Sequence, residues 1–150
     1  MLRLTIELVP KPLWRNNLRE LMGQYRWKKL REKVYADNGY KCAICGAEGV
    51  RLNCHEVWEY DDKNHIQRLR GFTALCNMCH AVKHIGMTGI LAAQGNFDFE
   101  AVITHFCRVN QCDRSTWDKH YEESFRIWRE RSKHQWKVDL GEFAHLVRNS

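Results

Sequence analysis

The chain of 150 residues contains only two prolines, Pro10 and Pro12, and it lacks any long apolar run. Because no apolar stretch approaches the roughly 20 residues needed to cross a bilayer, the sequence predicts neither a membrane protein nor a membrane partner. The first ten residues also lack the apolar segment and small-residue cleavage site of a secretory signal. We therefore expect a cytoplasmic protein in a reducing compartment, where clustered cysteines more often bind metal than form disulfides.

Lysine and arginine are concentrated in the first third of the chain. The whole sequence has 24 Lys and Arg against 18 Asp and Glu, which gives a net charge of +6. Ten basic and four acidic residues lie between Met1 and Cys45, and these account for the entire excess. A local basic segment indicates a polyanionic partner such as nucleic acid. The charge alone is equally compatible with a solvated helix face.

Alternating apolar and polar residues predict four strands, which together with the predicted helices indicate an α+β fold. The first strand covers 2–9 and the last covers 136–140, and we expect these terminal strands to pair. Between them, strands over 51–57 and 67–75 flank a polar stretch, 58–65, that we expect to form a loop.

Four segments have apolar residues at helical spacing, with glycines after the first two and capping residues at the start of the last two. They are 26–38 (before Gly39), 77–85 (before Gly86 and Gly89), 98–110 (with Asp98 as N-cap) and a helix that opens at Ser115. We treat residues 1–150 as one domain. It has a basic N-terminal part (1–41), a central part (42–86) and a helical C-terminal extension (87–150).

Four of the seven cysteines form two CxxC pairs that are separated by 30 residues. They are Cys42, Cys45, Cys76 and Cys79. Two such turns can complete a tetrahedral site for zinc, and a closed site of this kind is structural because its binding energy is folding energy. A redox CxxC would need a thioredoxin-like context that this pattern lacks. Cys107 and Cys112 lie near an apolar helix face, so we expect them to be buried or incidental thiols.

Three histidines surround the second CxxC pair and the strand before it. His80 and His84 are four residues apart on a predicted helix, hence on one face and able to chelate one cation. His55 lies on the preceding predicted strand. Because the CxxC pairs would fix both elements, we expect the three histidines to form a second, open metal site with a general base.

The run from Cys42 to His84 resembles the zinc-containing HNH endonucleases, which are the ββα-metal nucleases. The shared pattern is a CxxC pair, a strand with the base histidine, a loop, a second strand and an LCxxCH start to the helix. The phrase Cys54-His55-Glu56-Val57-Trp58-Glu59-Tyr60-Asp61-Asp62 further resembles a bacterial and phage subgroup of HNH proteins. The resemblance implies a ββα-metal core stapled by a four-cysteine zinc site, with flanking helices and short terminal strands.

The resemblance also implies roles for individual residues. His55 matches the base that activates water, and His80 and His84 match residues that hold a catalytic divalent ion. Cys54 takes the place of a further ligand, and a thiolate there would favour Zn²⁺, Ni²⁺ or Mn²⁺ over Mg²⁺. Cys54 is equally compatible with simple packing. Gly71 takes the place of the middle asparagine, for which possible substitutes are Asn53, Asn64 and Asp61.

The function implied is a metal-dependent DNA endonuclease that acts on double-stranded DNA, with a homodimer possible for cutting both strands. The alternative is a zinc-stapled nucleic-acid-binding module with decayed catalysis, which the replacements at Cys54 and Gly71 favour. We expect phosphate contacts from basic side chains near the core. They are Arg26, Lys28, Lys29, Arg31, Lys33, Arg68, Arg70 and Lys83.

Overall fold

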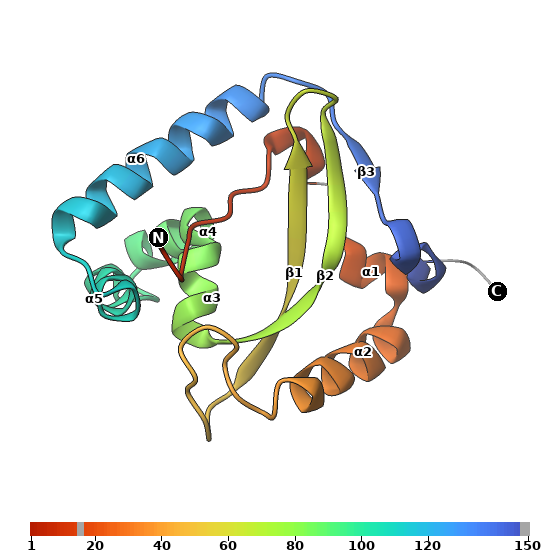
Figure 1. Ribbon diagram of the computed structural model, residues 1–150, viewed down its shortest axis with the longest axis horizontal. Helices are drawn as coiled ribbons and strands as arrows, with labels where there is room; N and C mark the ends of the chain where they lie inside the picture. The colour runs from red at the N-terminus through yellow and green to blue at the C-terminus, as the bar shows by residue number, and fades with distance from the viewer. Residues whose placement is uncertain (15–16, 148–150) are drawn as a thin grey trace.

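The computed structural model describes residues 1–14 and 17–147 and shows a mixed α+β fold around a long β-hairpin (Figure 1). Strand β1 (Leu52–Asp61) pairs antiparallel with β2 (Ile66–Cys76), and the short β3 (Lys137–Asp139) adds to β2 in parallel. Within the described ranges, no helix combines the length and the apolarity that a membrane span requires.

The hairpin is longer than the sequence predicted, because the expected loop over 58–65 is mostly strand. Tyr60 keeps the strand alternation, and its ring packs against Trp136 with centroids 5.7 Å apart. The turn is closed by Asp61, whose carboxylate accepts hydrogen bonds from the backbone N–H groups of Lys63 and Asn64. The polar residues expected to form a loop therefore extend the sheet away from the core.

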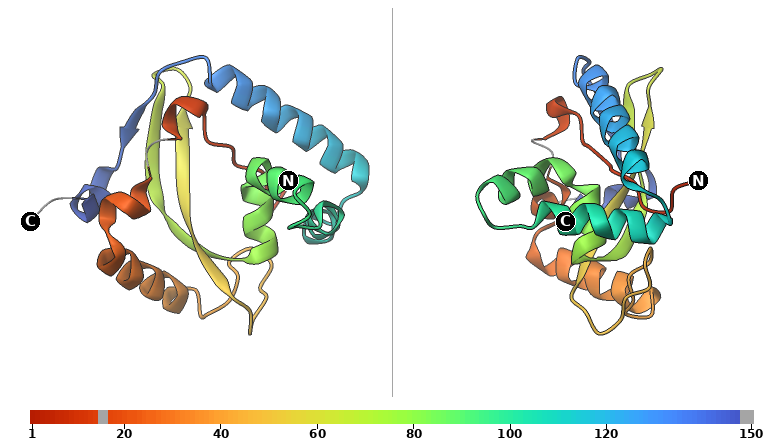
Figure 2. Two further views of the ribbon diagram at one scale, coloured as in Figure 1. Left: turned by 180° about the vertical axis from the view of Figure 1, so that it is seen from behind. Right: turned by 90° about the vertical axis from the view of Figure 1, so that its left-hand side faces the viewer.

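The N-terminal segment is extended but is not a strand, which corrects the prediction for 2–9. Its backbone donors are taken by other groups: Leu4 N–H donates to Asn110 Oδ1 at 2.9 Å, and Ile6 N–H donates to His120 Nε2 at 2.8 Å. The segment therefore has no strand partner, and β3 pairs with β2 instead of with it. It runs between the last long helix and the hairpin (Figures 1 and 2).

The helices surround the hairpin in the order given by the chain. They are η1 (Lys11–Leu13), α1 (Leu18–Met22), α2 (Gln24–Asp37), α3 (Asn77–Lys83), α4 (Ile85–Ala93), α5 (Phe99–Asn110), α6 (Arg114–Arg131) and η2 (Gly141–Val147). The helices predicted over 26–38 and 98–110 are confirmed, and Asp98 caps α5 by accepting from Ala101 N–H. The predicted start at Ser115 is wrong, because Asp113 is the N-cap of α6.

The expected helix stop at Gly86 and Gly89 is also wrong. The chain bends at His84 and continues as α4, where the Thr88 hydroxyl is 2.7 Å from the Ala81 carbonyl oxygen and donates to it. Both glycines are positions of close packing, since a Cβ on Gly89 would lie 3.8 Å from the Phe99 ring. Small side chains therefore let α4 pack closely and do not end the helix.

Two hydrophobic clusters lie on either side of the hairpin. One joins the N-terminal segment to α3, α5 and α6 through Leu4, Val82 and Phe106, all fully buried. The other joins α1, α2 and β2 through Met22 and Trp27. Figure 1 shows α3–α6 on one side of the hairpin and α1 and α2 on the other. Strand β1 thus carries its side chains into the space between the two groups of helices.

Candidate functional site

Four cysteines come together where the segment before β1 meets the junction of β2 and α3. Cys42 and Cys45 lie in the turn that precedes β1, whereas Cys76 ends β2 and Cys79 lies in the first turn of α3. Their sulfur atoms all lie within 4.8 Å of one another. Because thiolate sulfur is a preferred zinc ligand, this four-cysteine centre could hold a metal ion such as zinc.

Local backbone geometry turns the two CxxC segments toward each other. Gly46 has a φ of +77°, a left-handed conformation that favours glycine, and its N–H donates to the Cys42 carbonyl at 2.9 Å. Cys76 is the N-cap of α3, where its Sγ accepts a hydrogen bond from Cys79 N–H at 3.4 Å. Cys76 therefore ends a strand, starts a helix and offers a metal ligand.

Close packing of the sulfur atoms divides their protonation states. A hydrogen bond from the Cys79 thiol lowers the pKa of Cys42 to about 4, against the opposing effect of burial. The same bond raises the pKa of Cys79, and burial raises the pKa of Cys76. Several thiolates would repel one another at these distances, and a bound cation would remove that repulsion.

His105 on α5 is a buried neighbour of the four-cysteine centre that the sequence did not reveal. Its Nε2 lies 3.2 Å from the Sγ of Cys79. Arg108 donates to its Nδ1 at 3.0 Å, so the proton of the neutral imidazole is on Nε2 and is directed at the sulfur. A donor of this kind stabilises thiolate charge around a metal site.

A second group, the histidine cluster, brings together His55, His80 and His84. His55 comes from β1, His80 lies on α3, and His84 is the residue at which α3 ends. The ring centroids are 5.6 Å apart for His55 and His80, 5.1 Å for His55 and His84, and 4.5 Å for His80 and His84. One ring nitrogen from each lies within 4.8 Å of the others. The structure thus brings together the three histidines selected from the sequence.

Burial favours the neutral form of two of these imidazoles. It lowers the pKa of His80 to about 4 and that of His84 to about 3, and the neighbouring imidazoles add to both shifts. Neutral imidazole is the form that binds metal. At neutral pH these two side chains are therefore ready to act as ligands without first losing a proton.

Glu7 of the N-terminal segment holds the third histidine in place. Its Oε2 lies 2.8 Å from His55 Nε2, and its Oε1 accepts a hydrogen bond from Lys83 Nζ, also at 2.8 Å. Burial opposes ionisation of Glu7, but the bond to His55 and the charge of Lys83 outweigh it and lower its pKa to about 2. Because Glu7 is ionised and accepts, His55 donates from Nε2 and keeps the lone pair on Nδ1.

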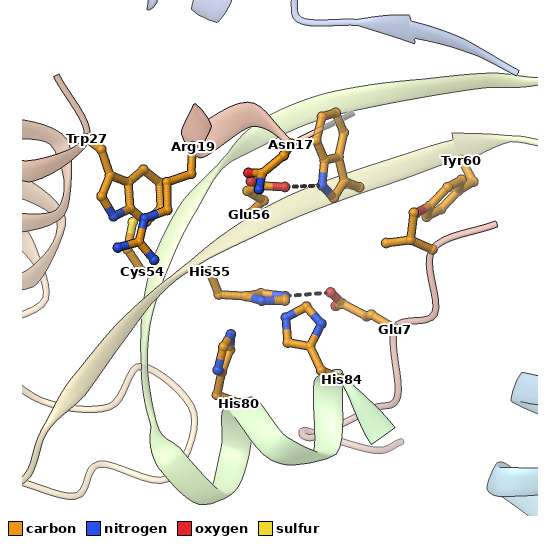
Figure 3. A pocket seen from close by; sticks show the side chains of 12 residues that line it. Glu7, Asn17, Arg19, Trp27, Cys54, His55, Glu56, Tyr60, His80 and His84 are labelled. Atoms are coloured by element: carbon orange, nitrogen blue, oxygen red, sulfur yellow. Dashed lines mark hydrogen bonds and ion pairs between the residues drawn. The ribbon is translucent and has the colours of Figure 1, made fainter. Parts of the chain in front are cut away.

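The histidine cluster opens into a cleft of about 340 Å³. Figure 3 shows Glu7 on one side of the three imidazoles and the Arg19 and Trp27 side chains on the other. Trp58 and Tyr60 of β1 also line the cleft. The four-cysteine centre and the histidine cluster are therefore different in kind, since only the histidines face a space large enough to admit part of a ligand.

Cys54 stays outside the histidine cluster. Its side chain packs against the apolar cluster that contains Trp27. Burial raises the pKa of the Cys54 thiol to about 12, with the charge of Glu56 adding to the shift. At neutral pH the side chain is a protonated thiol, which is a poor metal ligand.

The position of the missing asparagine is structural in this chain. Gly71 lies at the β-bulge of the hairpin, opposite Val57, with a φ of +155°. Asn64 donates to Asp61 within the hairpin turn. Asn53 donates to the carbonyl of Leu75 and to the Asn77 side chain. These residues brace the hairpin, and they are not among the groups that line the histidine cleft.

Three of the expected phosphate contacts have partners inside the protein. Arg70 makes a two-point ion pair with Glu59, and Arg68 lies 3.5 Å from Asp61. Lys83 is buried, with 6% of its surface exposed, and it donates to Thr5 and Glu7. Its ammonium group neutralises Glu7 and is not presented to a partner.

The basic helix α2 differs from these in that most of its charged side chains face solvent. Lys28, Lys29 and Lys33 are exposed, Arg31 is half-buried, and Arg26 donates to the Leu146 carbonyl at 3.1 Å. Two of the lysines are near acidic residues one turn away, at 4.0 Å and 2.6 Å. Exposed pairs of this kind are weak and can be exchanged for contacts with a partner.

Comparison of the chain with family models, with curated proteins and with solved structures found no match in any of the three. The resemblance of residues 42–84 to HNH nucleases therefore rests on the motif and its spacing. The functional argument below rests on the site geometry together with that motif.

Proposed function

We propose that this protein is a metal-dependent endonuclease that hydrolyses phosphodiester bonds in DNA. The observation that carries the proposal is the convergence of His55, His80 and His84 at a cleft, with two imidazoles neutral and the third held by an ionised carboxylate. The HNH-like order of the motif along the chain supports the same activity. We further infer that zinc fills the four-cysteine centre in a structural role.

The donor set of the histidine cluster fits a borderline divalent ion. His80 and His84 would hold it, and nitrogen ligands suit Zn²⁺, Ni²⁺ or Mn²⁺ better than Mg²⁺, which prefers oxygen. Such an ion would supply positive charge to the scissile phosphate and to the leaving 3′ oxygen. Cys54 contributes no thiolate, so the protein's own ligands here are imidazoles.

His55 would act as the general base through Nδ1, taking a proton from the attacking water. Glu7 accepts from Nε2 and so fixes the ring and its tautomer, as a carboxylate does for the histidine of a catalytic triad. When Nδ1 gains the proton, Glu7 also stabilises the resulting positive charge. Lys83 keeps Glu7 ionised throughout, because its ammonium group lies 2.8 Å from the carboxylate.

The direct test is nicking of supercoiled plasmid DNA in the presence of Mg²⁺, Mn²⁺, Ni²⁺ or Zn²⁺. The wild-type protein should nick the plasmid, and His55→Ala should slow nicking by about 100-fold or more. His145→Ala is the matched control, because this exposed histidine contacts the Glu142 carbonyl of its own helix, away from the cleft. Metal titration of His55→Ala should still show binding of a second ion through His80 and His84.

Two results would overturn this assignment. Undiminished nicking by His55→Ala would remove His55 from the chemistry, and loss of the second ion in that variant would make His55 a ligand instead of the base. If no ion supports nicking by the wild type while zinc remains bound, the second candidate function is favoured. That candidate is a nucleic-acid-binding module, and the neutral Cys54 thiol and Gly71 are the observations that favour it.

A further inference from the structure

The histidine cleft continues into a second depression on the side away from Glu7. This depression, named the arginine groove below, has a volume of about 360 Å³. It shares Arg19, Trp27, Cys54 and His80 with the histidine cleft, so the two are adjacent along β1. A ligand that lies in one can therefore extend into the other without leaving the protein surface.

Three arginines from separate elements line the arginine groove. Arg19 comes from α1, Arg31 from α2, and Arg51 from the residue before β1. No acidic residue lines the groove in the part of the chain that the structure describes. Over the same residues, no ion pair joins any of the three to an acidic side chain, in contrast to Arg68 and Arg70.

The Arg19 side chain is also positioned. Its guanidinium lies over the Trp27 ring, 5.4 Å from the centroid, and Trp27 beneath it is only 8% exposed. Figure 3 shows the guanidinium and indole stacked beside Cys54 and facing the same space as His80. A planar guanidinium held in this way can donate two hydrogen bonds to one phosphate group.

We propose that Arg19, Arg31 and Arg51 bind successive phosphodiester groups of the nucleic-acid strand that reaches the histidine cluster. The inference rests on the proposed function for the identity of the ligand, but it assigns residues that the basic motif of the sequence did not single out as a set. Two of them, Arg19 and Arg51, are exposed residues outside the helix predicted to be basic. The strand enters from the α1–α2 side and reaches His80 first.

The test is fluorescence anisotropy of 5′-fluorescein-labelled 20-nucleotide DNA, as duplex and as single strand, over a range of salt and with no divalent ion added. The triple variant Arg19→Gln, Arg31→Gln, Arg51→Gln should bind about tenfold or more weakly. The slope of log K against log salt should flatten by about 2.7 for duplex and about 2 for single strand. The two DNA forms show which source of phosphodiester the groove prefers.

A matched control removes the same net charge elsewhere. Arg114→Gln, Arg126→Gln, Lys133→Gln changes three exposed, ion-paired residues of α6 and the turn after it, on the other side of the hairpin. This control should keep the wild-type slope. Arg31→Gln, Arg51→Gln leaves the Arg19 and Trp27 stack intact and should give about two thirds of the effect if the triple variant is less stable.

The results separate this inference from the proposed function. Binding that depends on the three arginines, without nicking under any ion, would support the groove and overturn the nuclease. Nicking by the wild type, together with equal affinity and slope in the triple variant, would overturn the groove alone. Equal losses in the triple variant and the α6 control, or no measurable binding by the wild type at low salt, would also overturn it.

Discussion

The four-cysteine centre and the histidine cluster are both groups of metal-binding side chains, and they share helix α3. The four-cysteine centre is closed: Cys42, Cys76 and Cys79 are 2%, 6% and 0% exposed, and His105 covers one sulfur from outside. The histidine cluster instead faces a cleft of about 340 Å³. The same helix thus begins inside a site suited to structure and ends inside a site suited to chemistry.

The difference lies in which contacts surround each group. Four thiols supply a complete tetrahedral set, leaving no position for a substrate or water. Three imidazoles leave coordination positions open, and their outer partner is a carboxylate that can stabilise a proton on His55. Removing a ligand should therefore destroy the fold in the first case and the activity in the second.

The largest effect is expected at the four-cysteine centre. Cys79→Ser removes one of four sulfur ligands, and structural zinc typically contributes about 10–16 kcal/mol of apparent binding free energy, as much as the whole stability of a small domain. We expect the variant to lose zinc and to unfold at room temperature, which circular dichroism and zinc analysis would measure. Cys107→Ser is the control and should keep both. A folded Cys79→Ser protein with an unchanged melting temperature would contradict the structural role.

The next effect concerns pH and the histidine cluster. His80 and His84 have folded pKa values of about 4 and about 3, below the ordinary 6.5. Between these values the unfolded chain binds protons that the folded chain does not. The free energy of unfolding should therefore be fully retained above pH 6.5 and fall by a few kcal/mol as the pH drops toward 4.

Denaturant unfolding across this pH range would measure the effect in the protein without a second ion. The control is His80→Asn, His84→Asn, which keeps the four-cysteine centre, so the difference between the two curves isolates the histidines. Parallel curves would contradict the pKa shifts. The contribution of Glu7 is separable, because its folded pKa of about 2 matters only below pH 4.5.

The smallest effect is expected at Glu7, which acts on the histidine cluster from outside. Glu7→Gln keeps the size of the side chain but removes the negative charge beside His55, and nicking should fall by about 10- to 100-fold. The pH profile of nicking should shift as well, since the charge that stabilises protonated His55 is gone. Glu7→Asp should restore part of the rate. A uniform loss with an unchanged pH profile would indicate a purely structural role for Glu7.

Much of the fold followed from local patterns in the sequence. The helices over 26–38 and 98–110 and the strand over 67–75 have strong periodicity and clear caps, and the structure confirms them. The N-terminal segment alternates like a strand, yet Asn110 and His120 take its backbone donors. Alternation reports which residues are buried and does not report what their backbone groups bind, so the pattern could not distinguish the two structures.

The candidate site divides in the same way. CxxC spacing and the four-residue spacing of His80 and His84 are local, and both clusters could be anticipated from them. Glu7 lies 48 residues before His55 and His105 lies 26 residues after Cys79, with no motif around either. These partners depend on how α3, α5 and the N-terminal segment pack together, and a single sequence carries no local signal for that.

The anchoring of the N-terminal segment has a consequence for the order in which the protein becomes complete during synthesis. Glu7 is among the first residues made, but its segment is fixed by Asn110 and His120, over a hundred residues later. A nascent or truncated chain that stops before α6 contains all three histidines and all four cysteines of the two sites. It still lacks the anchor that brings the carboxylate to His55, so the reactive centre is assembled only after nearly the whole chain exists.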